Sequence, residues 1–563
     1  MEQKDGSEIL PIRRYEATSY GSAGRSPLAN YRCNYIGAIK HMAMRASFTI
    51  LLVLSMKAVI AQIPPVLEWQ GCFGGTGQEG PAVIAATPDG GVIMTTFTQS
   101  NDGQVSGNHG GQDVWVVKLD EARAIQWQRC YGGSGNDAGG GVHVLGDSGY
   151  IVTAITNSSD GDVSFNHGGS DVWVIRLSPQ GDLLWEKTYG GPGFESASRS
   201  ILTEANEVFI AGRSQQIGGD VTSNSGGFDM WLLRINLEGV LLWQRSLGGT
   251  GFDEGRSLAM TPDGGLLAIA QTDSDDQAVQ GNHGGYDMWA VRLDPAGEVV
   301  WTRCIGGSAN DYGNRLIRLA NGDWLATGST ESNDGDVTGY HGAGDGWLTR
   351  ISDSNAIVWS KAIGGNLGEV LSPLIELGDG SILVGGSTSS NDGDVTFTPL
   401  ASDSWLLGVS PDGTIQWQTH FGGSGGEGVA SLVQLPLSGY AFGTSTTSND
   451  GDVSGNHGGS IPIDAWIFQV SPISSIAEGI ASNSIVAYPN PAHDMLHLKL
   501  PDSWVQAPSY TLFAASGKVA LQGTLSRVHG TGAVDVSGLC AGSYSLVIQE
   551  HGQMAFGQIT IVR

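Results

Sequence analysis

Residues 171–191 read DVWVIRLSPQGDLLWEKTYGG, and this stretch decides the fold because it recurs with a fixed period along the chain. Its second tryptophan has counterparts at intervals of 58 residues, each followed four positions later by an aromatic or aliphatic residue and Gly-Gly. The series is Trp69, Trp127, Trp185, Trp243, Trp301, Trp359 and Trp417. The chain is therefore built from seven copies of one unit.

Each unit contains four short β-rich runs that are separated by turn residues. In the unit that begins at Tyr131, the runs cover residues 139–145, 150–155, 171–177 and 183–188. They show no helical periodicity, and Gly, Asp, Ser and Pro cluster between them. We expect four β-strands in each unit and name them a, b, c and d in chain order.

Seven four-stranded units predict an all-β fold, a seven-bladed β-propeller, rather than a solenoid of shorter coils. The first tryptophan strand, around residues 66–72, has no a, b or c strand before it, whereas the last unit ends with its c strand at residues 464–470. We expect the N-terminal strand to complete the last blade as its d strand. Such closure leaves no free sheet edge.

A second tryptophan lies in each c strand, two positions after an aspartate. We expect the tryptophans of both series to pack blade against blade. An aspartate at the entry to a strand commonly accepts hydrogen bonds from nearby backbone N–H groups, and we expect that structural role here. The pairs are Asp113/Trp115, Asp171/Trp173, Asp229/Trp231, Asp287/Trp289, Asp345/Trp347, Asp403/Trp405 and Asp464/Trp466.

The connections between strands b and c are long and acidic. In an up-and-down blade they share one face with the d–a connections, while tight a–b and c–d turns form the other face. Loops carry function more often than tight turns, so the long-loop face is the expected binding face. The candidate ligand-binding or cation-binding residues are Asp102, Asp160, Asp162, Asp334, Asp336, Asp392, Asp394, Asp450 and Asp452.

Two interpretations of these aspartates stay open. Asp-Gly-Asp turns present hard oxygens, of which calcium takes about six to eight, although the glutamate of an EF-hand loop is absent. The alternative, which the pattern favours, is turn chemistry in which Asn and Asp bond their own backbone. Histidines accompany the loops one per blade, so we expect them to stabilise turns rather than to bind zinc, which needs converging ligands. They are His109, His167, His283, His341 and His457.

Composition excludes some classes of partner. The 563 residues include 56 acidic and 28 basic side chains, for a net charge of −28. Phosphate binding needs a basic surface, so a nucleic-acid partner is not expected. Cys72, Cys130 and Cys304 occupy one position in three repeats, where they cannot approach closely enough for disulfides. We expect them to be small buried hydrophobes.

The N-terminus carries features of a secretory signal. An apolar run at residues 48–56 follows Arg45, and Ala58-Val-Ile-Ala61 resembles a cleavage site. The run is too short to span a bilayer, so no integral membrane segment is expected in the mature chain. We assign residues 42–61 to the signal peptide and residues 1–41 to a mis-assigned start or a non-native leader.

Sequence motifs of enzymes are missing. The chain has no Gly-x-Ser-x-Gly elbow, His-Glu-x-x-His pair or Walker loop. The Gly413-to-Trp417 spacing is similar to part of a quinoprotein propeller repeat, but the rest of that motif is absent and a quinone cofactor does not carry over. A catalytic site normally breaks a repeat, and the departures at residues 215–220 and 398–402 contain no catalytic set.

The last part of the chain is a different, small β-rich domain. Its segments in order are Tyr488-Pro-Asn-Pro-Ala492, a strand, a Ser-Gly-Lys turn and a Gly-x-Tyr-x-Leu strand. They resemble the type A C-terminal sorting domain (Por) of the type IX secretion system of Bacteroidota. The residues that carry the resemblance are Tyr488, Pro489, Asn490, Pro491, Gly517, Lys518, Gly542 and Tyr544.

The resemblance implies passage through the periplasm and then export by the type IX machinery, to the medium or the outer-membrane surface. The expected domains are the propeller at residues 62–472, a linker at 473–484 and the sorting domain, a small β-sandwich, at 485–563. The first functional hypothesis is a binding or adhesion module for a glycan or surface polymer, with calcium as a possible cofactor. The alternatives are a polysaccharide hydrolase or lyase and a structural surface-layer protein.

Overall fold

The computed structural model describes residues 64–435, 439–458, 463–473, 486–488, 492–499, 508–514, 519–525, 531–550 and 553–562. Within these ranges all named elements are β-strands. No helix in the described part of the chain is long and apolar enough to cross a membrane. The predicted leader and signal peptide, and all but the first residue of the predicted linker, lie outside the described residues.

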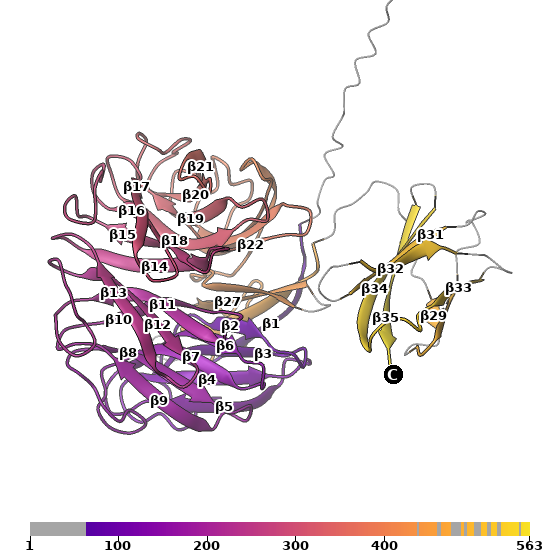
Figure 1. The fold of residues 1–563 in the computed structure, drawn as a ribbon, viewed down its shortest axis with the longest axis horizontal. Helices are drawn as coiled ribbons and strands as arrows, with labels where there is room; N and C mark the ends of the chain where they lie inside the picture. Colours follow the sequence, from indigo (N-terminus) through magenta and orange to yellow (C-terminus); the bar gives the residue numbers. More distant parts are fainter. Residues whose placement is uncertain are drawn as a thin grey trace, which may run out of the picture. The chain divides into compact units, whose positions relative to one another are not determined.

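Seven four-stranded antiparallel sheets form the propeller, in chain order around the ring (Figure 1). Blade 1 contains β2 (Val83–Ala86), β3 (Val92–Thr98), β4 (Asp113–Leu119) and β5 (Ile125–Tyr131). Blade 2 contains β6 (Asp137–Val144), β7 (Tyr150–Thr156), β8 (Asp171–Leu177) and β9 (Leu183–Tyr189), and blade 3 contains β10 (Ser196–Leu202), β11 (Glu207–Ser214), β12 (Asp229–Asn236) and β13 (Leu241–Leu247). Blade 4 contains β14 (Asp253–Met260), β15 (Leu266–Thr272), β16 (Asp287–Leu293) and β17 (Val299–Ile305), and blade 5 contains β18 (Asp311–Arg318), β19 (Trp324–Thr330), β20 (Asp345–Ile351) and β21 (Ile357–Ile363). Blade 6 contains β22 (Glu369–Glu376), β23 (Ile382–Thr388), β24 (Asp403–Val409) and β25 (Ile415–Phe421).

Blade 7 is shared between the two ends of the propeller, as the sequence predicts. Its strands are β26 (Ser431–Leu435), β27 (Gly439–Thr446), β28 (Asp464–Val470) and the N-terminal β1 (Leu67–Phe73). The register of β1 on β28 places Cys72 opposite Trp466 and Phe73 opposite Ala465. The ring is therefore closed by backbone hydrogen bonds between segments nearly 400 residues apart in sequence.

The apolar core lies between neighbouring blades. Trp173 of β8 packs with Val114 and Val116 of blade 1 as well as with Ile175 of its own blade. All seven c-strand tryptophans are buried, with at most 1% of the residue exposed. The alternation of strand side chains thus supplies one apolar face to each neighbouring blade, which confirms the predicted role of this series.

The tryptophans of the outer d strands pack on the turns of the next blade. A Cβ added at Gly181 would lie 2.8 Å from the ring of Trp127, and one at Gly239 would lie 3.1 Å from the ring of Trp185. Both glycines have a positive φ, of 82° and 74°. Glycine is required there both for the turn and for the close approach of the indole.

The three repeat cysteines behave as predicted. Cys72, Cys130 and Cys304 are buried and are not disulfide-bonded. Burial, with smaller contributions from nearby carboxylates, raises the pKa of each thiol to about 12. These thiols therefore stay protonated and unreactive.

The C-terminal region is a small sandwich of two sheets. One contains β29 (Val486–Tyr488), β30 (Met495–Lys499) and β33 (Thr531–Asp535), and the other contains β32 (Val519–Thr524), β31 (Ser509–Ala514), β34 (Gly542–Glu550) and β35 (Gln553–Ile561). Leu496 and Val534 of the first sheet share a buried core with Leu512, Leu546 and Ile559 of the second. The two-sheet architecture agrees with the sequence prediction.

Replacing Trp173 with alanine tests the core between the blades. The buried indole fills a site between blades 1 and 2, so we expect a loss of about 3–5 kcal/mol in the free energy of unfolding. Urea denaturation of the purified protein, followed by tryptophan fluorescence, measures this loss. Trp185→Ala removes a partly exposed indole and should cost clearly less; equal losses would contradict the assignment.

Candidate functional site

The loop aspartates of the long-loop face are bound to the neighbouring d–a connections. The first aspartate of each loop accepts the N–H of the residue after Gly-Gly, at 2.7 or 2.8 Å. The pairs are Asp102 with Thr76, Asp160 with Ser134, Asp334 with Ser308, Asp392 with Asn366 and Asp450 with Ser424. These contacts place the b–c and d–a connections on one face, as expected.

The second aspartate of each loop also contacts the Gly-Gly segment. The carboxylates of Asp162, Asp394 and Asp452 accept the N–H of Gly132, Gly364 and Gly422 at 3.2–3.3 Å. Asp336 instead lies 3.9 Å from Arg303, while its backbone N–H donates to Gly306. The aspartates of each loop contact the connection that leads into their own blade. The structure therefore does not bring the nine aspartates together in one site.

Backbone bonding lowers the pKa of four of the first aspartates. The N–H bond from the Gly-Gly segment is the largest cause of a lowered pKa at Asp102, Asp160, Asp334 and Asp450. These bonds come from a connection 26 positions earlier in the chain and not from the aspartate's own turn, so they differ from the local turn chemistry that the sequence favours. Among the described residues no three or more His, Cys, Asp or Glu side chains are grouped to hold a metal ion. The calcium hypothesis, which can also draw on backbone carbonyl oxygens, stays a prediction.

The c-strand aspartates anchor the ends of the b–c loops. Asp113 Oδ2 accepts the backbone N–H of His109 at 2.9 Å and lies 2.6 Å from His109 Nδ1. The same imidazole contact recurs at 2.5–2.8 Å in the four other blades with a loop histidine. The predicted structural role of this aspartate series is thus confirmed.

In the two blades without a loop histidine, other residues contact the c-strand aspartate. In blade 6, His420 of β25 places its Nδ1 2.6 Å from Asp403, while Phe397 stacks on its ring at 4.0 Å between centroids. In blade 3, Ser225 occupies the histidine's position and donates its backbone N–H to Asp229, at 2.7 Å. The imidazole therefore supports the loop but is not needed in every blade.

A second series of buried carboxylates, which the sequence analysis did not identify, lies at the start of the a strands or up to four residues before it. Asp137 accepts the N–H of Gly133 at 2.8 Å and the hydroxyls of Thr156 and Ser158. Every blade has such an acid, buried to 3% exposure or less. The series is Glu79, Asp137, Glu195, Asp253, Asp311, Glu369 and Glu427. Alignment of the seven repeats on their Gly-Gly would have shown it.

The two carboxylate series meet at each blade junction. A Cβ at Gly132 would lie 2.6 Å from Asp137 Oδ2 and 2.8 Å from Asp113 Oδ1, so only glycine fits between them. The Oδ1 atoms of all seven c-strand aspartates are buried and have no hydrogen-bond partner in the described structure. Burial raises the pKa of Asp113, Asp171 and Glu79, and raises that of Asp287 to about 6.

The regular pattern breaks at the long-loop ends of blades 3 to 5. Phe228, Phe252, Tyr286 and Tyr312 form a continuous row, which we call the aromatic arc, with ring centroids 5.6, 6.0 and 5.7 Å apart. Each ring is partly exposed. In the other repeats the three equivalent positions hold apolar residues only at Phe194, Val370 and Ile463. The remaining equivalents are small or polar: Gln78, Gly80, Gln112, Asn136, Ala138, Ser170, Ser196, Glu254, Asn310, Gly344, Gly368, Ser402, Gly426 and Gly428.

Charged side chains flank the arc. The guanidinium carbon of Arg213 lies 4.5 Å from the ring centre of Phe228 and 5.2 Å from that of Phe252. Arg213 also lies 3.6 Å from Glu254, which contacts Arg256 at 3.1 Å. Partly exposed aromatic faces beside a few polar groups are typical of ligand sites. The aromatic arc is the candidate functional site, and only its departure from the repeat could have revealed it in the sequence.

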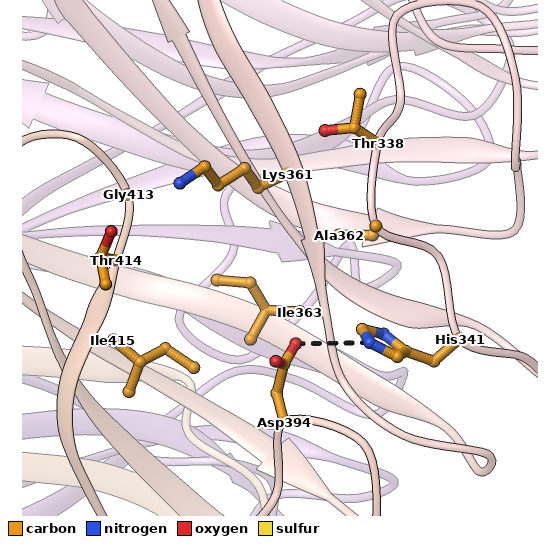
Figure 2. Close-up of a pocket in the computed structure, with 10 residues that line it drawn as sticks. Thr338, His341, Lys361, Ala362, Ile363, Asp394, Gly413, Thr414 and Ile415 are labelled. Atoms are coloured by element: carbon orange, nitrogen blue, oxygen red, sulfur yellow. Dashed lines mark ion pairs between the residues drawn. The ribbon is translucent and has the colours of Figure 1, made fainter.

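A separate pocket of about 510 Å³ lies between blades 5 and 6. Figure 2 shows His341 facing Asp394 across it, with Nε2 3.8 Å from Oδ2, and Lys361 above them. Ile363 lines the pocket at a position where blades 1 and 2 have tyrosines that reach the next blade. The shorter side chain leaves the space open, so Asp394 is a predicted loop residue that does line a cavity.

The proposed sorting residues are only partly described. Tyr488 ends β29, and Gly542 begins β34 opposite Ile561. Tyr544 is buried and donates its hydroxyl to the Cys540 carbonyl at 2.9 Å. Pro489, Asn490, Pro491, Gly517 and Lys518 lie outside the described residues.

Comparison with known proteins identifies the C-terminal domain. Residues 486–562 match the family model of the secretion system C-terminal sorting domain, which confirms the predicted resemblance. This domain indicates export to the medium or the cell surface and handling by the type IX machinery. The chain is also 24% identical over 264 residues to the regulatory protein FlaEY of Caulobacter vibrioides. That match covers 44% of this chain and only 27% of FlaEY.

Solved structures with similar folds are remote. The WD40 domain of Neurospora crassa Pan2 is 11% identical, with a TM-score of 0.40 over 70% of this chain and 90% of that chain. A DUF4221-family protein from Bacteroides vulgatus is 10% identical, with a TM-score of 0.32 over 74% of this chain and all of that chain. Likeness at this level carries no functional argument.

The calcium hypothesis predicts that chelation destabilises the propeller. Bound calcium stabilises the folded state by mass action, so EDTA should lower the melting temperature and purified protein should contain stoichiometric calcium. Melting curves with EDTA or added calcium, together with elemental analysis, measure both. If the aspartates only bond the Gly-Gly segments, neither the melting temperature nor the metal content will respond.

The raised pKa of the Asp287 carboxyl makes the free energy of unfolding depend on pH. Its folded-state pKa of about 6 exceeds the unfolded value, so its contribution is fully present below about pH 4 and is lost as the pH rises through 6. Asp287→Asn should remove this dependence and gain on the order of 2 kcal/mol relative to the wild type between pH 4 and pH 7. Urea unfolding at both values measures the difference. Asp182→Asn, in an exposed turn, controls for the loss of one negative charge.

Proposed function

We propose that the propeller is an exported binding module and that the aromatic arc is its site for a saccharide. The observation that carries this proposal is the break in the repeat: four contiguous aromatic rings gather in adjoining blades, at positions that hold mostly small or polar residues elsewhere. Core packing does not explain the replacement, because the rings stay partly exposed. Exposed and contiguous aromatic side chains are instead characteristic of binding surfaces.

The chemistry of the arc fits a sugar chain. Pyranose rings have an apolar C–H face that packs on aromatic rings, and their hydroxyls need hydrogen-bond partners at the edge of the site. Arg213, Glu254 and Gln271 supply such groups beside the arc, with Gln271 Nε2 donating to Glu254 at 3.2 Å. Hydrogen bonds among these side chains position them before a ligand arrives, which lowers the entropic cost of binding.

The export domain makes such a ligand accessible. A protein released to the medium or held at the cell surface meets polysaccharides outside the cell. The near-regular repeat elsewhere supplies a rigid frame, while one sector of the long-loop face is specialised. Together these features favour adhesion or capture over the alternatives of catalysis and a purely structural role.

Binding to a glycan array by the purified protein tests this proposal. We expect Phe252→Ala or Tyr286→Ala to weaken binding of the best saccharide by about tenfold or more, because buried aromatic contacts dominate such sites. Isothermal titration calorimetry measures the change. The control is Phe165→Ala, which removes a 56% exposed ring elsewhere on the long-loop face. Failure to bind any saccharide, or equal weakening by the control, would overturn the proposal.

A further inference from the structure

Three arginines lie on the innermost strands of the specialised sector. Arg199 is in β10, Arg256 in β14 and Arg315 in β18, the a strands of blades 3, 4 and 5. We call them the axial arginines because a strands line the centre of the ring. Positive charge concentrated there is unexpected in a chain with a net charge of −28.

The Arg315 side chain reaches from blade 5 to the start of blade 7. Arg315 Nη2 donates at 3.1 Å to the carbonyl of Ala430, which precedes β26 two blades further on. Burial and the nearby charges of Arg199 and Arg256 lower the pKa of Arg315. Burial and Arg199 likewise lower the pKa of His143, on β6, to about 4. The a strands that carry the axial arginines are neighbours, because β10 lies beside β14 and β14 beside β18.

Carboxylates do not neutralise this charge. Glu254 contacts Arg256 and is also shared with Arg213. Arg315 donates only to the carbonyls of Asn314 and Ala430, and its Nε is buried without a partner in the described structure. The Arg199 side chain makes no hydrogen bond or ion pair with any described residue.

Unpaired, half-buried guanidinium groups destabilise a fold unless an anion joins them. Their planar donor geometry matches the oxygens of a carboxylate or sulfate, which can accept two parallel N–H bonds. The axial arginines are also continuous with the aromatic arc: Arg213 stacks on Phe228 and Phe252, and Glu254 joins Arg213 to Arg256.

We infer that Arg199 and Arg315 bind the anionic group of an acidic glycan whose sugar rings pack on the aromatic arc. This inference rests on the proposed saccharide function. It adds the chemical class of the ligand, which is a carboxylated or sulfated polysaccharide. Arg256, which is already paired with Glu254, positions the site and contributes a longer-range field. The acidic surface elsewhere on the molecule would repel such a polymer from other sites.

Inorganic sulfate tests the anion site independently of any sugar. Sodium sulfate should raise the melting temperature by about 2 °C over sodium chloride at equal ionic strength, because it binds only the folded state. The double variant Arg199→Gln/Arg315→Gln should lose this gain. Arg129→Gln removes an exposed arginine on β5 and should keep it. Equal shifts in all three proteins would reflect general salting-out and would overturn the anion site.

Oligosaccharide titrations test the assignment to an acidic glycan. We expect oligogalacturonate or a sulfated chondroitin oligosaccharide to bind at least about tenfold more tightly than a neutral cello-oligosaccharide, and the double variant to lose that preference. The preferred acidic probe distinguishes carboxylate from sulfate. Equal binding of neutral and acidic probes, unchanged in the double variant, would overturn the inference and leave the saccharide function standing. Sulfate stabilisation without binding of any saccharide would overturn the saccharide function and the acidic-glycan assignment together.

Discussion

The propeller depends on the connections in which the chain passes from the d strand of one blade to the a strand of the next. At every junction the Gly-Gly segment passes between two buried carboxylates, and the N–H of its second glycine donates to one of them. A low-dielectric site makes these charge-assisted bonds strong, but it also penalises any carboxylate oxygen that is left unpaired. Seven repetitions of this arrangement fix the angle between blades, and the apolar faces pack within that frame.

Much of the architecture could be predicted because it follows from periodic features. The tryptophan interval, the turn residues and the displaced d strand together predict seven blades closed by the N-terminal strand, and the pairing of β1 with β28 confirms it. The conserved spacing of Asp113 and Trp115 predicts a strand entry with bonded backbone. These inferences need only local chemistry and counting.

The candidate site could not be predicted in the same way. The aromatic arc joins Phe228, Phe252, Tyr286 and Tyr312, which occupy three different places in their repeats and meet only because blades 3 to 5 are adjacent. Arg199 and Arg315 are 116 positions apart, yet both lie on a strands, which line the centre of the ring. The loop aspartates repeat from blade to blade and bond the frame, whereas the candidate binding surface lies where the repeat is irregular.

Closure of blade 7 by β1 also shapes how the molecule folds. The strands β1 and β28 are separated by nearly the whole propeller, so bringing them together costs about 5 kcal/mol of chain entropy on a logarithmic loop-closure scale. Blades 1 to 6 are formed from contiguous segments, whereas the final sheet requires both ends at once. Such a high contact order makes the last step slow. The finished ring opens only by breaking the β1–β28 ladder or a whole blade interface. Slow opening of this kind favours kinetic persistence of the exported protein.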